Sequence, residues 1–176
     1  NRLDTIEKVH LRACKTFLGV PLQSPNKMVY GDLGRYPLFV STFVSSVRYW
    51  FRILKMSQER LPKQAYHMLL TVDQRGGQCW ATHVKNILCK TGFAEVWFFQ
   101  GAGNEDVFLQ LFKQRLIDIY VQEWHSAIGE SERHQQYVQM KGMFETEPYL
   151  CNIDRFYFRS GISKARFNML PLNGNV

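Results

Sequence analysis

One stretch of this sequence constrains the fold more than any other: the residues after Pro37 alternate apolar and polar with the period of an α-helix. Proline suits the first helical turn, where its missing N–H costs nothing. An apolar stripe follows one side of the predicted helix, through Val40, Phe43, Val44, Val47, Trp50 and Leu54. The opposite side carries Ser41, Ser45, Arg48, Arg52 and Lys55. One side is therefore suited to a core, and the other to water or an acidic partner.

Helical periodicity continues through most of the chain, interrupted by Gly and Pro. Ser24 is the predicted N-cap of one helix, ahead of Pro25. The apolar run 93–99 is the one place where a strand pattern competes; without a second such run to pair with, we expect an extended or irregular segment. The sequence thus predicts an all-α fold, an irregular bundle of about seven to eight helices. Besides the helix after Pro37, they are expected over residues 3–18, 24–33, 62–72, 80–90, 105–127 and 130–141, with one or two more in 153–170.

The chain of 176 residues is long enough for one domain with an attached segment. We expect a helical domain over residues 1–151 and a basic C-terminal helical segment with a loose tail over 152–176. No apolar run approaches the length of a membrane-spanning helix, and no secretory signal is visible. The sequence opens inside a helical pattern without an initiator Met, which predicts an excerpt from a longer protein. We separately expect an intracellular location.

The net charge of +7 is unevenly distributed along the chain. Residues 1–63 carry 11 basic and 4 acidic side chains, and residues 152–176 carry 4 and 1. The region between them, 64–151, carries 7 basic and 10 acidic side chains. Two basic ends flanking a mildly acidic middle favour a polyanionic partner, such as nucleic acid, over a uniformly solubilised surface.

Signals for catalysis or cofactor binding are weak. The four cysteines are scattered without a CxxC pair, which is typical of small buried hydrophobic residues in a reducing compartment. Cys79, His83 and Cys89 could supply three zinc ligands, but their spacing fits no common finger and no fourth ligand is local. A cysteine nucleophile paired with His83 or His125 has no local support either. We expect no catalytic residue, no metal, no cofactor and no small-molecule ligand.

Two sets of basic residues are the candidate nucleic-acid-binding sites. Contacts of this kind would neutralise phosphates and position a backbone. The first set is Arg48, Arg52, Lys55, Arg60 and Lys63, and the second, expected on an exposed face, is Arg155, Arg159, Lys164 and Arg166. Aromatic residues interleave with both sets, in RYWFR (48–52) and DRFYFRS (154–160), and could stack on bases or could be core. Because Trp50 falls on the apolar stripe, we expect it in the core.

Extended sequence similarity covers nearly the whole chain. The chain resembles the region downstream of the reverse transcriptase core in non-LTR (LINE-type) retrotransposon polyproteins. The resemblance rests on IEKVHLRACKTFLGV, SPNKMVYGDLGRYPL, YWFRILKM, RLPKQAY, GFAEVWFFQGAGNEDVFLQLFKQRLIDIYVQEWHSAI and EPYL, in this order. It identifies a region rather than an active site, because the catalytic aspartates of such polymerases would lie upstream and no Tyr/Phe-Ala-Asp-Asp box occurs here.

The resemblance implies a non-catalytic accessory segment of a reverse transcriptase, one that helps hold template RNA or target DNA. It also implies an upstream polymerase domain as a partner, and a location in the nucleus and cytoplasm. The alternative hypothesis is a helical protein-interaction or scaffold module that docks onto a polymerase core or onto a second copy of itself. Salt dependence would discriminate between them, because phosphate contacts weaken steeply as salt rises.

Overall fold

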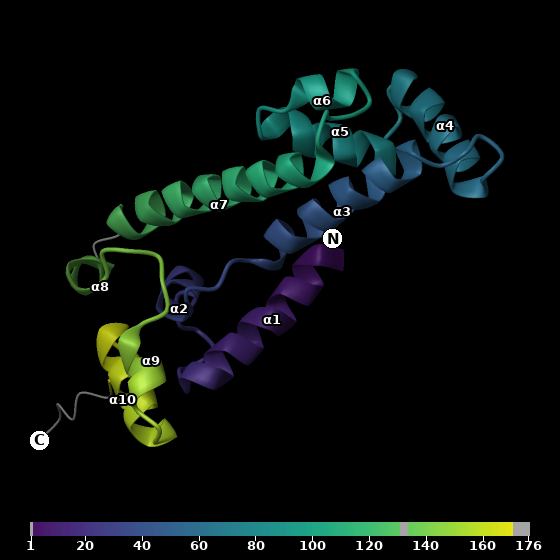
Figure 1. Ribbon diagram of the computed structural model, residues 1–176. Helices are drawn as coiled ribbons and strands as arrows, with labels where there is room; N and C mark the ends of the chain where they lie inside the picture. Colours follow the sequence, from purple (N-terminus) through teal and green to yellow (C-terminus); the bar gives the residue numbers. More distant parts are fainter. Residues whose placement is uncertain (1, 131–133, 171–176) are drawn as a thin grey trace, which may run out of the picture. The chain divides into compact units, whose positions relative to one another are not determined.

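The computed structural model describes residues 2–130 and 134–170, and every element in them is a helix (Figure 1). The all-α prediction is confirmed, but the described residues form ten helices rather than seven or eight. The helices are α1 (Arg2–Leu18), α2 (Asn26–Leu33), α3 (Leu38–Leu54), α4 (Leu61–Gln74), α5 (Trp80–Lys90), α6 (Ala94–Phe98), α7 (Glu105–Gly129), α8 (Gln135–Met140), α9 (Pro148–Asn152) and α10 (Phe156–Arg166).

The chain divides into two compact units. Unit 1 combines residues 1–38 with 119–176, and unit 2 is the continuous segment 39–118. Helix α7 contributes its first part to unit 2 and the remainder to unit 1. The boundary that we expected at residue 151 does not coincide with a boundary between these units.

The core of unit 2 is built mainly from aromatic rings. Trp50 is fully buried and stacks on Trp97, with ring centroids 5.5 Å apart. The indole N–H of Trp50 donates to the Tyr66 hydroxyl at 2.8 Å, and that hydroxyl donates to Gln100 Oε1 at 2.5 Å. A neutral hydrogen-bonded chain therefore satisfies the polar atoms that this aromatic core buries.

Within the segment 93–99, residues 94–98 form the helix α6, where we expected an extended or irregular segment. Gly92, at φ 85°, ends α5 in the left-handed conformation, and the Phe93 N–H bonds back to the Leu88 carbonyl at 2.8 Å. The turn leads into α6, whose Trp97 is buried against Trp50. Five residues are too few for helical periodicity to be visible in the sequence, and tertiary packing decides the conformation.

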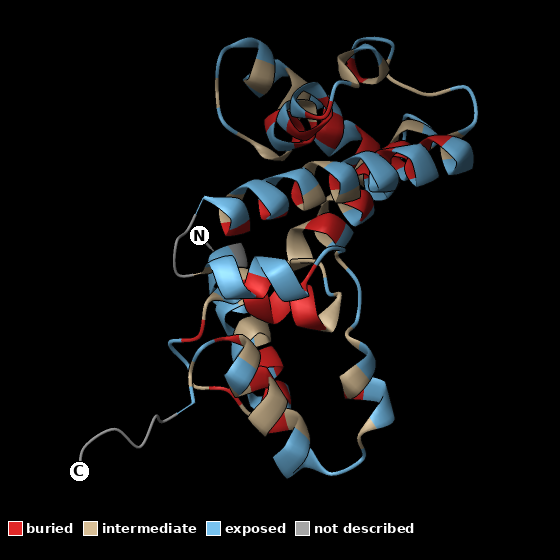
Figure 2. Cartoon of the chain, turned by 90° about the vertical axis from the view of Figure 1, so that its left-hand side faces the viewer, coloured by how far each residue is buried: buried red, intermediate tan, exposed pale blue. Residues whose placement is uncertain are grey.

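Unit 1 packs α2 against the second part of α7 and the three C-terminal helices. Trp124 of α7 is fully buried and donates its indole N–H to the Lys27 carbonyl at 2.8 Å. Gly31 of α2 allows this close approach, because a Cβ there would lie 2.7 Å from the Trp124 ring and closer still to the Tyr137 hydroxyl. The buried residues of the long helix α7 lie along one side of it (Figure 2), whereas five consecutive residues of α2, 28–32, are buried.

The predicted N-cap of α2 is wrong. Pro25 occupies the N-cap position, and no side chain caps the helix. The Ser24 side chain is buried instead, with its hydroxyl 3.0 Å from the sulfur of Met169. A contact 145 residues away in the sequence thus replaces the local cap that residue type alone favours.

Candidate functional site

Helix α3 presents a basic surface opposite its buried side. Val40, Val44, Val47 and Trp50 of the predicted stripe are buried, while Phe43 and Leu54 are half-buried. On the other side, Ser41, Ser45, Arg48, Arg52 and Lys55 are all exposed, as the periodicity predicted. We call Arg48, Arg52 and Lys55 the α3 basic face.

The three cations of the α3 basic face differ in their partners. Lys55, just after the helix, forms an ion pair with Glu105 at 2.8 Å, although its side chain remains 69% exposed. Arg48 and Arg52, one turn apart, form no ion pair with any residue that the structure describes. Arg60, exposed at the N-cap of α4, likewise has no acidic partner within the described ranges.

Lys63 does not belong to this surface. Lys63 is only 7% exposed, and its ammonium donates to the backbone carbonyl of Leu54 at 2.8 Å. That carbonyl is at the C-terminal end of α3, where a cation also complements the helix dipole. The ammonium therefore joins the start of α4 to the end of α3, and our expectation that it extends the exposed positive charge is wrong.

The second predicted set is only partly exposed. Arg155 is exposed at the N-cap of α10. Arg159 is half-buried, with its guanidinium 5.5 Å from the centre of the Phe17 ring and 3.5 Å from the Leu150 carbonyl. Lys164 is half-buried along a surface pocket. The single exposed basic face that we expected over 153–170 is therefore wrong for most of its members.

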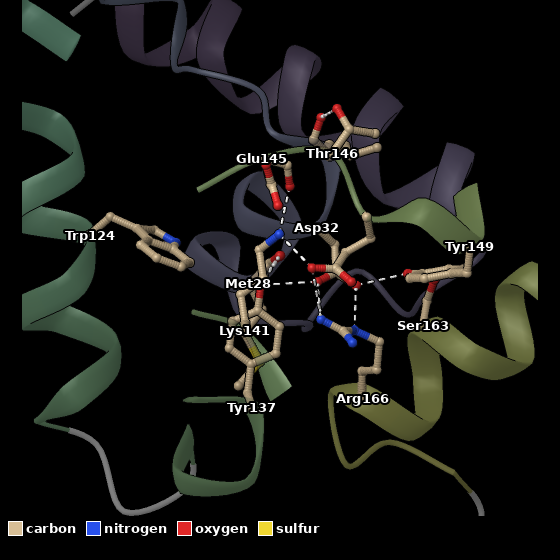
Figure 3. Close-up of polar contacts among 12 residues, drawn as sticks. Met28, Asp32, Trp124, Tyr137, Lys141, Glu145, Thr146, Tyr149, Ser163 and Arg166 are labelled. Atoms are coloured by element: carbon tan, nitrogen blue, oxygen red, sulfur yellow. Dashed lines mark hydrogen bonds and ion pairs between the residues drawn. The ribbon is translucent and has the colours of Figure 1, made fainter. Parts of the chain in front are cut away.

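Arg166 lies in a buried ion pair (Figure 3). Its Nε and NH2 groups donate to both carboxylate oxygens of Asp32, at 3.1 and 3.2 Å. The Asp32 carboxylate is fully buried, and the hydroxyls of Tyr137 and Tyr149 also donate to it, at 3.0 and 2.8 Å. Four hydrogen bonds thus satisfy the buried charge of Asp32. Two of them come from Arg166, which is 134 residues away in the sequence.

A second acidic group, Glu147, extends this network. Its carboxylate is 3.2 Å from the Arg166 guanidinium and 2.5 Å from the ammonium of Lys141, a residue only 3% exposed. Lys141 also donates to the Glu145 carbonyl, and the Glu147 N–H donates to the Asp32 carbonyl at 2.9 Å. We call Asp32, Lys141, Glu147 and Arg166 the buried charge network. It ties the loop before α9 and the end of α10 to α2.

Burial sets the electrostatics of the network. It raises the pKa of Asp32 above its ordinary value, and the Arg166 charge with the hydrogen bond from Tyr149 limits that rise. Burial alone would lower the pKa of Arg166, but the adjacent Asp32 carboxylate outweighs it and the pKa of Arg166 is raised. The pKa of Tyr137 is raised by burial and by the same carboxylate. These groups face one another, so the network is structural rather than a site open to a ligand.

Helix α4 carries an exposed apolar surface that sequence reasoning missed. Leu61, Met68 and Val72 are 78%, 71% and 42% exposed and lie with Ala65 at three- and four-residue steps on one side of the helix. We call these four residues the α4 surface. Ala65 is exposed, whereas the next residue, Tyr66, is buried. The helical spacing of these four residues was visible in the sequence. However, Tyr66, Leu69 and Leu70 form a second apolar face, and spacing alone does not decide which face is buried.

Other candidate chemistry finds little support in the structure. Among the described residues, no group of three His, Cys, Asp or Glu side chains could hold a metal ion. All four cysteines are free; Cys14 alone is buried, and Cys89 and Cys151 are exposed, against our expectation of buried cysteines. In the same ranges, no helix is long and apolar enough to cross a membrane.

Comparisons with known proteins assign no family. No protein-family model, no curated protein and no solved structure matches the chain.

Proposed function

We propose that this chain is a non-catalytic nucleic-acid-binding segment, which contacts phosphates through the α3 basic face. The observation that carries the proposal is the exposure of Arg48 and Arg52 on a helix whose other side is buried, with no acidic partner in the described chain. Unit 2 carries 10 basic and 6 acidic side chains, so its field favours a polyanion.

The geometry of the α3 basic face suits a phosphate backbone. Arg48 and Arg52 are about 6 Å apart along the helix, because four residues rise by this much. Each guanidinium presents a fork of N–H donors that matches phosphate oxygens. A rigid helix holds both side chains at one surface, so less conformational entropy is lost when they bind. Such contacts fix position and carry no base sequence.

The sequence resemblance suggests where this binding would be used. An accessory segment next to a retrotransposon reverse transcriptase would help hold template RNA or target DNA, beside the polymerase domain of the same polyprotein. It would act within the cell, in the nucleus and cytoplasm. The catalytic step would belong to the polymerase domain.

Fluorescence anisotropy tests the proposal with three labelled probes: single-stranded RNA, duplex DNA and an RNA–DNA hybrid. We expect the variant Arg48→Glu/Arg52→Glu/Lys55→Glu to bind at least about tenfold more weakly, with unchanged circular dichroism. The control Lys90→Glu/Lys113→Glu/Arg115→Glu reverses three exposed cations elsewhere in unit 2 and should retain most of the affinity. An equal loss in both variants, or no loss in the first, would contradict the assignment of the site.

A second candidate function is self-association through the α4 surface. Along the middle of this surface, the exposed neighbours Gln64, His67 and Thr71 carry no acidic or permanently charged group. The charged side chains within α4 are engaged elsewhere: Lys63 bonds the Leu54 carbonyl, and Asp73 pairs with Lys85 at 2.9 Å. The exposed cations Arg60 and Arg75 flank the two ends of the helix, so two copies of the chain could meet at the middle of the surface without placing like charges in contact there.

Light scattering after size-exclusion chromatography tests this second candidate. Self-association predicts a molar mass that rises with concentration, and loss of that rise in Met68→Lys, because a lysine in an apolar interface is costly. Met143→Lys is the matched control, since Met143 is similarly exposed, at 67%, in unit 1. A monomer at all concentrations would exclude self-association.

A further inference from the structure

The start of α10 exposes three aromatic side chains in a row. Phe156 and Phe158 are 51% and 52% exposed, and Tyr157 is 82% exposed. Exposed aromatic side chains in succession are unusual for a surface that meets only water, since apolar area of this kind normally marks a binding site. The sequence left open whether DRFYFRS is core or a stacking surface, and the structure excludes the core.

The helix that carries these rings is held firmly on its other side. Ser160 is buried and donates its hydroxyl to the Gly19 carbonyl at 2.8 Å. Gly19 leaves room for this contact, because a Cβ there would lie 2.6 Å from the Ser160 hydroxyl. Ser163, one turn later, is fully buried and bonds the Tyr149 hydroxyl at 2.8 Å. The aromatic residues therefore project from a well-packed helix.

A pocket of about 650 Å³ opens beside the three rings, within the size range of small-ligand sites. Tyr157, Gly161 and Lys164 line it and follow one another at four- and three-residue steps, so they share one side of α10. A Cβ at Gly161 would meet no atom within 4 Å, so the space between the tyrosine ring and the lysine is open. The surface offers a flat aromatic face with a cation about two helical turns further on.

The charges around the pocket favour an anionic occupant. Arg155 is exposed at the N-cap directly before the rings, and Lys164 lines the pocket. Of the four basic side chains in residues 152–176, Arg166 lies in the buried charge network and Arg159 packs on Phe17, which leaves Arg155 and Lys164 against one acidic side chain, Asp154. Aromatic rings beside cations are the combination that binds a nucleic-acid strand by stacking its bases and neutralising its phosphates.

We propose that this surface binds single-stranded nucleic acid, with unpaired bases stacking on Tyr157 and Phe158 and phosphates on Arg155 and Lys164. The inference rests on the proposed nucleic-acid binding and names the class of strand that is bound. A duplex buries the faces of its bases, whereas unpaired bases can leave the stack and lie on aromatic side chains. The α3 basic face would accept any phosphate backbone; the surface on α10 requires free bases.

Anisotropy titrations of the full chain can separate stacking from phosphate binding. The probes are a single-stranded RNA of about 12 nucleotides, a fully abasic strand of the same length and a duplex of the same length. We expect Tyr157→Ala/Phe158→Ala to weaken binding of the RNA strand about tenfold or more, and to leave the abasic strand and the duplex nearly unchanged. The matched control is Phe98→Ala/Phe99→Ala, which removes two exposed rings from unit 2.

A second variant tests the site without removing an aromatic ring. Gly161→Leu places a side chain beside Tyr157, at a position where a Cβ would meet no atom within 4 Å, and replacing a helical glycine favours the helix. We expect it to weaken binding of the RNA strand while the thermal midpoint stays the same or rises. Gly161→Ala should retain more of the affinity, because its side chain is smaller.

The outcomes distinguish this inference from the proposed function. Unchanged RNA affinity in both α10 variants, or an equal loss for all three probes, would overturn the α10 site and leave the α3 basic face untouched. If α10 variants instead changed only the molar mass, the surface would be a protein interface and the inference would also fail. The proposed function is tested separately with the abasic strand, which offers phosphates without bases. The α3 triple variant should lose binding to this strand, and the α10 variants should retain it.

Discussion

The two units differ in how many of their basic side chains take part in holding the fold together. In unit 1, Lys15 donates to the Leu22 carbonyl at 2.7 Å, and Lys141 and Arg166 lie in the buried charge network. In unit 2, Arg48 and Arg52 remain on the surface, opposite an aromatic core that is closed without them. Net charge therefore does not reveal which cations can reach a partner. The structure of each unit shows which cations are exposed.

The difference follows from what each unit must join. Unit 1 is assembled from two distant parts of the sequence, and Arg166 bonds Asp32 across 134 residues. Ion pairs with four hydrogen bonds fix such a junction in one geometry. Unit 2 is continuous, and its rings supply the burial that holds it together. One cation of unit 2 also has a structural role: Lys63 joins α4 to α3 by donating to the Leu54 carbonyl.

Alkaline pH should have the largest effect, and it should act mainly on unit 1. Burial raises the pKa of four tyrosines there, with nearby carboxylates adding to the rise: Tyr30, Tyr120, Tyr137 and Tyr149. The unfolded chain loses these protons from about pH 10, while the folded chain retains them. The stabilisation is therefore complete below about pH 10 and falls above it, by about 1.4 kcal/mol per tyrosine and pH unit.

Urea unfolding at a series of alkaline pH values checks this expectation. The free energy of unfolding should fall by about 4 kcal/mol between pH 10 and 11, about 1 kcal/mol from each of the four tyrosines, because an unfolded tyrosine is half ionised at pH 10. Tyr30→Phe removes one titrating hydroxyl and should reduce that fall by about a quarter. A free energy that stays constant through this range would contradict the buried tyrosines of unit 1.

Breaking the buried charge network should cost nearly as much. Asp32→Ala removes the acceptor of four hydrogen bonds and leaves the partly buried Arg166 guanidinium with Glu147 as its acidic partner, and we expect a loss of about 3 to 5 kcal/mol in urea unfolding. The control is Lys55→Ala, which breaks the exposed ion pair with Glu105 in unit 2 and should cost less than about 1 kcal/mol. Similar losses in the two variants would remove the contrast between the units.

The neutral chain in the core of unit 2 gives a smaller expected effect. Tyr66→Phe leaves the Trp50 indole N–H buried without its acceptor, at a cost of about 1 to 3 kcal/mol. Because no charge is stranded, the loss should be smaller than that of Asp32→Ala. Tryptophan fluorescence during urea unfolding would measure it. A loss as large as that of Asp32→Ala would show that unit 2 depends on polar contacts as strongly as unit 1.

Much of the fold could be predicted because periodicity reports which side of a helix is buried. It placed α3 with the correct exposed residues, including Arg48 and Arg52, and it placed α5 and α7 nearly to their ends. Periodicity could not reveal α6 and α9, because each helix has five residues, which is too short for a repeating apolar pattern to be recognised. Nor could composition reveal that residues 1–38 pack with 119–176, since that depends on contacts such as Ser160 with Gly19.

The candidate site was predictable only where local spacing decides it. A basic side chain opposite an apolar stripe is exposed unless another element covers it, and nothing in the described chain covers Arg48 or Arg52. This reasoning does not hold for Lys63 and Arg166. The tertiary fold brings the Leu54 carbonyl to Lys63 and the Asp32 carboxylate to Arg166. The phosphate contacts themselves stay a prediction.

The salt dependence of RNA binding tests the central claim most directly. Each phosphate contact contributes about 0.7 to the slope of log affinity against log salt for a single strand. The variant Arg48→Gln/Arg52→Gln should reduce the slope by about 1.4, whereas Lys63→Gln, whose ammonium is already bound inside unit 2, should leave it unchanged. An unchanged slope in the arginine variant would contradict phosphate binding by the α3 basic face.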